Sequence, residues 1–347
     1  MPNVPGADRA AHPRKQPGVC YASTDEGVEL PVIDVTHPAF HLELSAEDMA
    51  SGFRTHLAMM GRRRVPVWLL RLWAHLVARR SPLVRGVVGA AGGFLGGMDT
   101  YLLKLGPANL DPGLFSGMDR KVAGSFPALA ARIRLQEAAR RMARGLGPAL
   151  AARPAGPLHF VNIAGGPALD SLNALILLRR RHPEWLEGRQ VHIHVLDLQR
   201  EAPRFGQRAL AALGAEGGPL HGLAVTFRHL DYDWSDPRVL RELLAGLEPG
   251  SVVAASSEGG LFNYGSDQAI GANLAALRAG TPADCPVVAS VAWDTELQRP
   301  ARRFSRIASR NFTPGQFEAL VRSTGWELER GVPSPTRQVV CLMQVPQ

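Results

Sequence analysis

Three short apolar runs in the second half of the chain each end in residues that could bind a nucleotide-like cofactor. The first run, 159–164, leads into Gly165-Gly166, and such small residues let the backbone approach a ligand closely. Asp197 ends the second run, where a carboxylate can accept hydrogen bonds from both hydroxyls of a ribose. Asp231 ends the third run and could accept one from an adenine amino group. Each signal is weak alone, but three in succession predict a cofactor site.

The stretch Ser256–Asp267, at the end of a fourth apolar run, carries the candidate catalytic groups. Glu258 and Tyr264 could act as a general base or orient a substrate. The alternative is that Glu258 caps a loop and Tyr264 packs against its neighbours.

Two histidines, His192 and His194, alternate within one predicted strand and therefore share a face. This spacing is compatible with metal binding, but no third ligand is evident in the sequence. We therefore expect structural histidines and no metal site.

Repeated strand and helix patterns after residue 155 would position all of these residues. Five apolar runs alternate with helical or polar segments and lie at 159–164, 191–198, 223–233, 251–256 and 286–293. This order predicts a parallel sheet with helices on both faces. Two closing runs, from Trp326 and from Arg337, predict an antiparallel hairpin. The expected fold class is α/β, with a seven-stranded, mostly parallel Rossmann-like sheet and a C-terminal antiparallel hairpin.

The sequence before residue 150 has helical periodicity instead. Ser45, with Asp48 three residues later, is typical of a helix N-cap. We expect a disordered tail over residues 1–25, an α-helical lid or substrate domain over 26–150, and a cofactor-binding domain over 155–347.

Two segments of the helical half suggest how it could act. Gly61–Arg85 holds seven arginines and no acidic residue, interleaved with tryptophan and leucine. A lid helix with a solvated basic edge is the simplest interpretation; a membrane-surface helix and a pocket for an acyl or polyprenyl-like substrate are the alternatives. The glycine-rich stretch from Gly92, beside Tyr101, suits a lid that closes over substrate.

The composition restricts partners and location. The formal net charge is +8, yet only three of the 39 basic residues are lysines, an arginine bias that indicates GC-rich coding rather than a specific nucleic-acid partner. The N-terminus has no apolar signal segment, and the longest uncharged run near the middle, Gly86–Met98, has 13 residues, which is too short for a transmembrane segment. Three scattered cysteines favour reduced thiols, and we expect a cytoplasmic protein.

From about residue 155 onward the chain resembles the class I S-adenosylmethionine-dependent methyltransferases. The family's first motif has the form acid-apolar-Gly-x-Gly-x-Gly, and 162–168 matches it position by position, with asparagine in place of the acid and alanine in place of two glycines. Asp197 falls at the family's ribose-binding acid and Asp231 at its adenine-contacting acid.

The resemblance implies S-adenosyl-L-methionine as cofactor and methyl transfer to an O, N or C atom of a small, largely apolar molecule, with a role in secondary metabolism. Glu258 and Tyr264 would lie at the acceptor, and a homodimer is compatible with this interpretation. The implied cofactor-binding residues are Asn162, Ala164, Gly165, Gly166, Asp197, Leu198, Asp231, Tyr232 and Ser257.

Other cofactors fit the sequence less well. A nicotinamide site of the GxGxxG type is absent from the first turn, and a Tyr-x-x-x-Lys pair is excluded after Lys121, the last lysine. The same absence excludes a pyridoxal phosphate Schiff base and a P-loop in the second half. Two other functions stay open: a cofactor-binding protein of this fold without methyl transfer, and a non-catalytic protein associated with a membrane surface.

Overall fold

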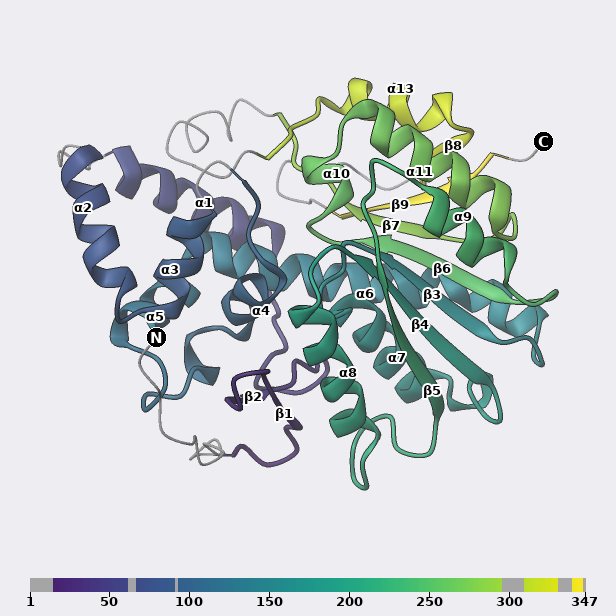
Figure 1. Cartoon of the computed structure of the whole chain (residues 1–347), viewed down its shortest axis with the longest axis horizontal. Helices are drawn as coiled ribbons and strands as arrows, with labels where there is room; N and C mark the ends of the chain where they lie inside the picture. Colours follow the sequence, from purple (N-terminus) through teal and green to yellow (C-terminus); the bar gives the residue numbers. More distant parts are fainter. Residues whose placement is uncertain (1–14, 62–66, 91–92, 295–308, 330–338, 346–347) are drawn as a thin grey trace.

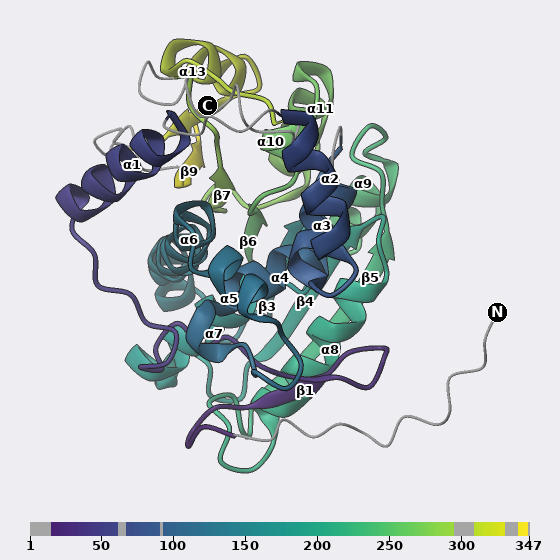
Figure 2. The ribbon, with the colours of Figure 1, turned by 90° about the vertical axis from the view of Figure 1, so that its left-hand side faces the viewer.

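The computed structural model describes residues 15–61, 67–90, 93–294, 309–329 and 339–345 (Figure 1). A large sheet with helices on both faces forms the second half of the chain, and a group of shorter helices lies beside one end of it (Figures 1 and 2).

The sheet has seven strands in the spatial order β5-β4-β3-β6-β7-β9-β8. The first five in this order are mutually parallel, whereas β9 runs antiparallel to both of its neighbours. The chain builds β3, β4 and β5 in one direction and then returns to add β6 and β7 on the other side of β3, so β3 and β6 flank the topological switch point. The strands are β3 (Leu158–Ile163), β4 (Gln190–Asp197), β5 (Ala224–Asp231), β6 (Val252–Ser257), β7 (Val287–Ser290), β8 (Trp326–Leu328) and β9 (Val339–Gln344).

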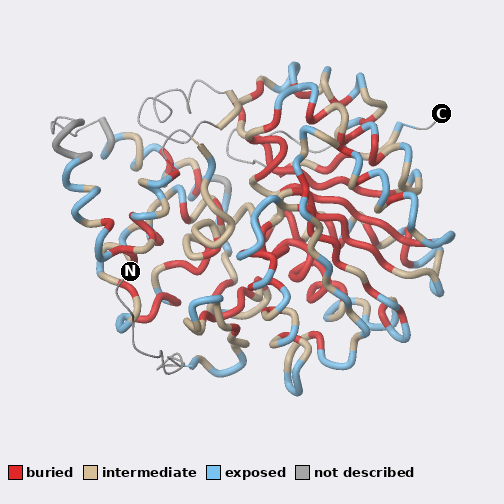
Figure 3. Tube along the Cα trace, viewed as in Figure 1, coloured by how far each residue is buried: buried red, intermediate tan, exposed pale blue. Residues whose placement is uncertain are grey.

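Alternation along the central strands sends apolar side chains to both faces of the sheet. On one face, Phe160 and Ile193 join a core that includes the long helix α6 (Phe126–Ala152), α7 (Leu169–Arg181) and α8 (Glu201–Gly214). The opposite face packs against α9 (Arg238–Ala245), α11 (Asp267–Gly280) and α13 (Pro314–Ser323), with the short α10 (Leu261–Tyr264) at the end of β6. Because both faces are covered, the central strands β3, β6 and β7 are buried along their whole length (Figure 3).

The helical half is assembled from short elements. A two-stranded sheet comes first, and α1 begins where the sequence predicts, because Ser45 Oγ accepts a hydrogen bond from Asp48 N at 3.0 Å. The elements are β1 (Tyr21–Ser23), β2 (Glu29–Pro31), α1 (Ala46–Gly61), α2 (Val67–Ala78), α3 (Pro82–Gly89), α4 (Gly97–Leu105), the 3-10 turn η1 (Pro107–Asn109) and α5 (Gly117–Ala123).

The structure confirms the fold class and corrects two details of the expected organisation. The predicted disordered tail over 1–25 does not hold for residues 15–25, because β1 pairs with β2 and Ala22 is buried in the main core. Residues 1–14 lie outside the described residues. Helix α6 lies on the sheet rather than in the lid, since its alanine and leucine stripe joins the core formed by α7 and α8. Among the described helices, none combines the length and apolar character needed to cross a membrane.

Candidate functional site

A cleft opens at the carboxyl ends of β3, β4 and β6, beside the switch point, and encloses about 870 Å³ including its open mouth. This is the place where open α/β sheets bind ligands. Residues of α4 and the segment before it form the opposite wall, and Figure 2 shows α4 in front of β3 and β4.

The turn from β3 to α7 forms the floor of the cleft. Ala164, Gly166 and Ala168 all have φ of +53°, a left-handed conformation that alanine rarely adopts. A side chain at Gly165 could not be accommodated, because its Cβ would lie 1.4 Å from Asn162 Oδ1. The turn therefore holds strained backbone at a ligand-facing position, as functional loops often do.

Beneath this turn lies a buried polar cluster of Asn162, Asp170 and Ser256. Asn162 Nδ2 donates to Asp170 Oδ1 and, at 3.2 Å, to Ser171 Oγ. Three polar atoms of the cluster, Asn162 Oδ1, Asp170 Oδ2 and Ser256 Oγ, have no hydrogen-bond partner among the described residues. Burial, together with the nearby charge of Glu258, raises the pKa of Asp170. Asp170 lines the cleft as a residue, but its Oδ2 atom is buried away from the open space, on the side of Asn162 and Ser256.

Asp197 lies in the cleft as predicted, but its carboxylate already has two partners. Oδ2 accepts from the amide of Gly166 at 2.9 Å, and Oδ1 accepts from the amide of Gln199 at 2.8 Å. Asp197 thus fixes the β3–α7 turn relative to β4. Each oxygen keeps acceptor capacity, because a carboxylate offers about four lone-pair sites.

Leu198 and Tyr232 also line the cleft, together with Trp234, a residue that the sequence analysis did not single out. Leu198 is 60% exposed, which is unusual for leucine. The hydroxyl of Tyr232 donates to Asn273 Oδ1, so its ring is held in place. Apolar and aromatic side chains at this point can cover the flat faces of a planar ring.

Asp231 is not among the residues that line the cleft, so the structure does not support its predicted contact with the cofactor. Its carboxylate is exposed and receives two hydrogen bonds from Arg200, with Arg200 Nε at 3.0 Å from Oδ1. The strand β5 lies at the sheet edge, where this side chain turns to solvent.

Glu258 is buried at the end of β6 and is bound by two cations. Lys104 Nζ, from α4, contacts Oε2, and Arg134 Nε, from α6, contacts Oε1. Burial alone would raise the pKa of Glu258, but the charges of Lys104 and Arg134 overcome that effect and lower it to about 2. A carboxylate with this pKa and with cations on both oxygens is not a general base near neutral pH, so the geometry does not support that role.

Tyr264 lines the cleft close to the ion cluster of Glu258, Lys104 and Arg134, whereas Ser257 is not among the cleft-lining residues. Burial raises the pKa of Tyr264, partly offset by the charge of Arg134, so the phenol stays protonated. Its ring lies 6.0 Å from that of Phe94, measured between centroids. Ser257 is buried, and its hydroxyl accepts from the amide of Leu261 at 2.9 Å, which anchors the start of α10.

Helix α4 is closely packed over the turn. A Cβ at Gly97 would come within 2.6 Å of Ala202 Cβ and 3.3 Å of Gly166 Cα, so only glycine fits there. The amide of Gly97 also donates to Gln199 Oε1 at 3.1 Å. The segment before α4, with α4 itself, therefore covers the cleft, as the lid prediction requires.

A second cavity of about 1640 Å³ adjoins the first and shares Phe94, Gly97 and Gln199 with it. The remaining lining comes from the helical half and from α8 and includes apolar side chains such as Leu30 and Phe115. The cleft thus continues into a larger space under the lid.

Comparison with known proteins gives similarity at the level of structure alone. No sequence-family profile and no curated protein sequence matches the chain. A possible exported protein from Bordetella parapertussis is 18% identical, with a TM-score of 0.52 over 90% of this chain and 99% of that protein. Magnesium protoporphyrin IX methyltransferase from Synechocystis, solved with bound S-adenosylhomocysteine, is 14% identical, with a TM-score of 0.42 over 63% of this chain and 88% of that one. The methyltransferase SibL is 13% identical, with a TM-score of 0.43 over 87% and 76% of the two chains.

The strand order, with the single antiparallel strand β9 between β7 and β8, is the order that the sequence resemblance implies. The chain has an α/β Rossmann-like fold with a mostly parallel seven-stranded sheet and a C-terminal antiparallel hairpin.

Within this fold the structure brings most of the predicted site residues together and separates three. Eight predicted residues line the cleft, and the remaining three, Asn162, Asp231 and Ser257, do not. Lys104, Arg134, Asp170 and Trp234 were missed by sequence reasoning. Only Asp170 had a signal, an acid in the first turn of the helix that follows the glycine turn. The eight cleft residues are Ala164, Gly165, Gly166, Asp197, Leu198, Tyr232, Glu258 and Tyr264.

Proposed function

We propose that this protein is an S-adenosylmethionine-dependent methyltransferase that acts on a small, largely apolar molecule. The observation that carries the proposal is the cleft at the switch point, where the strained β3–α7 turn and Asp197 face one space. A role in secondary metabolism and a cytoplasmic location belong to the same proposal.

The residues of the cleft match the chemical groups of the cofactor. Asp197 would accept hydrogen bonds from the ribose hydroxyls, and Leu198 with Trp234 would cover the adenine ring. The ammonium group of the methionine end would lie beside the turn that Asp170 follows, since Asp170 is among the residues that line the cleft. Gly165 lets the turn pack directly on Asn162 beneath it.

When bound, S-adenosylmethionine supplies an electrophilic methyl group on a sulfonium. The protein's contribution is then to align the acceptor and exclude water, because in-line displacement depends strongly on alignment. Helix α4 covers the cleft, and Tyr264 can orient the acceptor through its protonated hydroxyl. Glu258 acts indirectly, by holding Lys104 and Arg134 at the acceptor side of the cleft.

The second cavity favours the proposed class of acceptor. Its walls combine apolar side chains with a few charged ones, notably Arg85, Asp99 and Glu201. Burial raises the pKa of Asp99, and only partial compensation comes from the amide of Gly96 and the charge of Arg85. A molecule with an apolar body and a polar end fits such a lining.

A cofactor-binding protein without methyl transfer is the second candidate. Two observations favour it: alanine occupies two left-handed positions of the turn, and Glu258 is engaged with cations rather than available as a base. Turnover against a panel of acceptors separates the two candidates, because both bind cofactor and only the enzyme releases S-adenosylhomocysteine.

Thermal unfolding with a panel of cofactors tests the proposed site. A ligand that binds only the native state stabilises it by about 2.7 kcal/mol at a hundredfold excess over Kd. S-adenosylmethionine and S-adenosylhomocysteine should therefore raise Tm by several degrees, and NAD or NADP should leave it unchanged. A rise with NADPH alone would overturn the methyltransferase proposal.

A further inference from the structure

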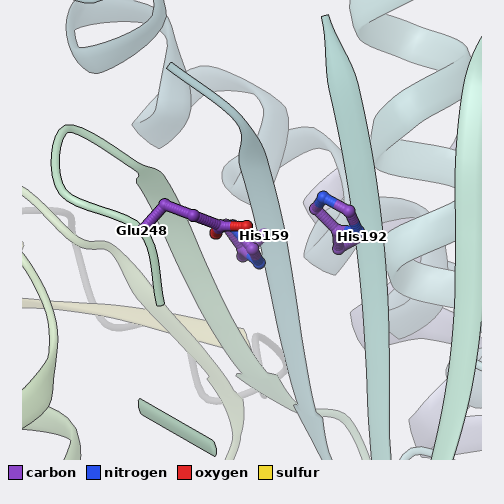
Figure 4. Close-up of side chains that lie close together, drawn as sticks. All are labelled: His159, His192 and Glu248. Carbon is purple, nitrogen blue, oxygen red and sulfur yellow. The ribbon is translucent and has the colours of Figure 1, made fainter. Parts of the chain in front are cut away.

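A cluster of histidines lies at the amino end of the sheet, away from the cleft. His159 near the start of β3 and His192 on β4 are register partners on adjacent parallel strands, so their side chains leave the same face side by side. Glu248, in the loop between α9 and β6, reaches toward them (Figure 4). The sequence analysis paired His192 with His194; the structure instead places His192 beside His159 and Glu248, because strand pairing supplies His159 and a loop supplies Glu248.

The three side chains are close enough to share one ion. One ligand atom from each of His159, His192 and Glu248 lies within 4.8 Å of the other two. His159 Nε2 is 3.1 Å from Glu248 Oε2, and the two imidazole centroids are 4.7 Å apart. The carboxylate is 60% exposed, so it can adjust its position without disturbing the core.

Neighbouring groups already orient both imidazoles. His159 Nδ1 lies 3.1 Å from His194 Nε2, and His192 Nδ1 lies 2.8 Å from Thr226 Oγ1. If each Nδ1 carries the proton, it donates to its neighbour and leaves Nε2 with a free lone pair. This arrangement, in which the second nitrogen of a ligating histidine has its own acceptor, is what metal-binding histidines typically require.

The groups around the three side chains, and the ligand types themselves, indicate which ion the cluster can hold. His194 lies behind His159, and its Nδ1 is buried without a hydrogen-bond partner among the described residues. Arg228, the register partner of His194, adds a positive charge nearby, and Glu248 is the carboxylate that opposes it. Two imidazoles and one carboxylate suit Zn²⁺ and similar divalent transition metals and do not suit Ca²⁺ or Mg²⁺, which prefer oxygen ligands.

We propose that His159, His192 and Glu248 form a binding site for one divalent transition-metal ion of the Zn²⁺ type, independent of the cofactor cleft. His194 and Thr226 position the two imidazoles, and solvent completes the coordination.

Titration of the metal-free, untagged full-length chain with Co²⁺ tests this site, because bound Co²⁺ has visible absorption bands that report its ligands. The wild-type protein should bind one equivalent saturably, and Zn²⁺ should displace it. Loss of groups that merely orient a ligand lowers metal affinity about 10- to 100-fold, so removal of a ligand in His192→Ala or Glu248→Gln should weaken Co²⁺ binding at least about tenfold. Both positions are solvent-accessible, so these variants are expected to fold.

His182→Ala is the matched control, because the partly exposed His182 lies 3.2 Å from Glu184 and no second imidazole lies beside that pair among the described residues. It should bind Co²⁺ as the wild type does. Thermal unfolding in the presence of S-adenosylmethionine should give the same cofactor response for His192→Ala as for the wild type, which separates this site from the cleft. No saturable Co²⁺ spectrum in the wild type, or equal binding by His192→Ala and Glu248→Gln, would overturn the proposal.

Discussion

Replacing Asp197 with alanine should weaken S-adenosylmethionine binding roughly 10- to 1000-fold. Hydrogen bonds to a charged group contribute about 1.5–3 kcal/mol each, and a tenfold change in affinity corresponds to about 1.4 kcal/mol. The structure adds a second reason for a large effect, because Asp197 also accepts from the amide of Gly166 and so holds the turn that forms the cleft floor. The fold should remain intact, since the carboxylate lies at a strand end outside the core.

Asp231→Ala provides the control for this measurement. Asp231 is the register partner of Asp197 at the end of the adjacent strand, but it faces solvent and pairs with Arg200. Loss of an exposed ion pair changes the stability of the protein by only about 0–1 kcal/mol, so Asp231→Ala should remain folded. Because the Asp231 carboxylate pairs with Arg200, calorimetric titration of this variant should give nearly wild-type affinity for S-adenosylmethionine. If Asp197→Ala binds as the wild type does, or if Asp231→Ala loses as much affinity, the assignment of the ribose site to Asp197 is wrong.

Glu258→Gln should destabilise the protein by about 3–5 kcal/mol, measured by denaturant unfolding without cofactor. Removing one partner of a buried ion pair leaves the other charge uncompensated, and the Lys104 side chain is only 6% exposed. Arg134 would lose the same partner. If Glu258 were instead a general base, the variant would lose turnover while keeping its stability.

Two further variants make the Glu258 result interpretable. Glu137→Gln breaks a more exposed pair with Arg141 on α6 and should cost less than about 1 kcal/mol. Adding Lys104→Met to Glu258→Gln removes the lysine that has lost its carboxylate partner, and should recover part of the lost free energy of unfolding. Equal destabilisation by Glu137→Gln and Glu258→Gln would contradict the proposed importance of the buried cluster.

The contribution of Glu258 and its two cations to stability should depend on pH. Two bound cations lower the pKa of folded Glu258 to about 2, against 4.5 for an unperturbed glutamate. The stabilising contribution is therefore fully present above about pH 4.5 and is lost as the pH falls toward 2. The stability difference between the wild type and Glu258→Gln should shrink over this range and stay constant above it.

Local sequence patterns predicted the sheet and its helices well, because burial on both faces of the sheet requires long apolar runs. The start of α1 at Ser45 and the turn from β3 to α7 also depend on residues that are close together in the sequence. The site was harder to predict. Lys104 and Arg134 lie 154 and 124 residues from Glu258 along the chain, and no periodicity indicates such a contact. The exposure of Asp231 depends on β5 being the sheet edge, and the partnership of His159 with His192 depends on strand register; both are properties of the assembled sheet.

The contact between Lys104 and Glu258 also affects how this architecture can change. The acid at the end of β6 is compatible with burial only while α4 supplies the lysine, and the glycine at the start of α4 must match the turn beneath it. The helical half shares one continuous core with one face of the sheet, from Ala22 and Tyr101 to Phe160. Grafting a lid from a relative onto this sheet would therefore remove Lys104 and leave Glu258 with Arg134 alone unless α4 were kept. New acceptor specificity is thus more accessible through changes in the second cavity than through exchange of the whole helical half.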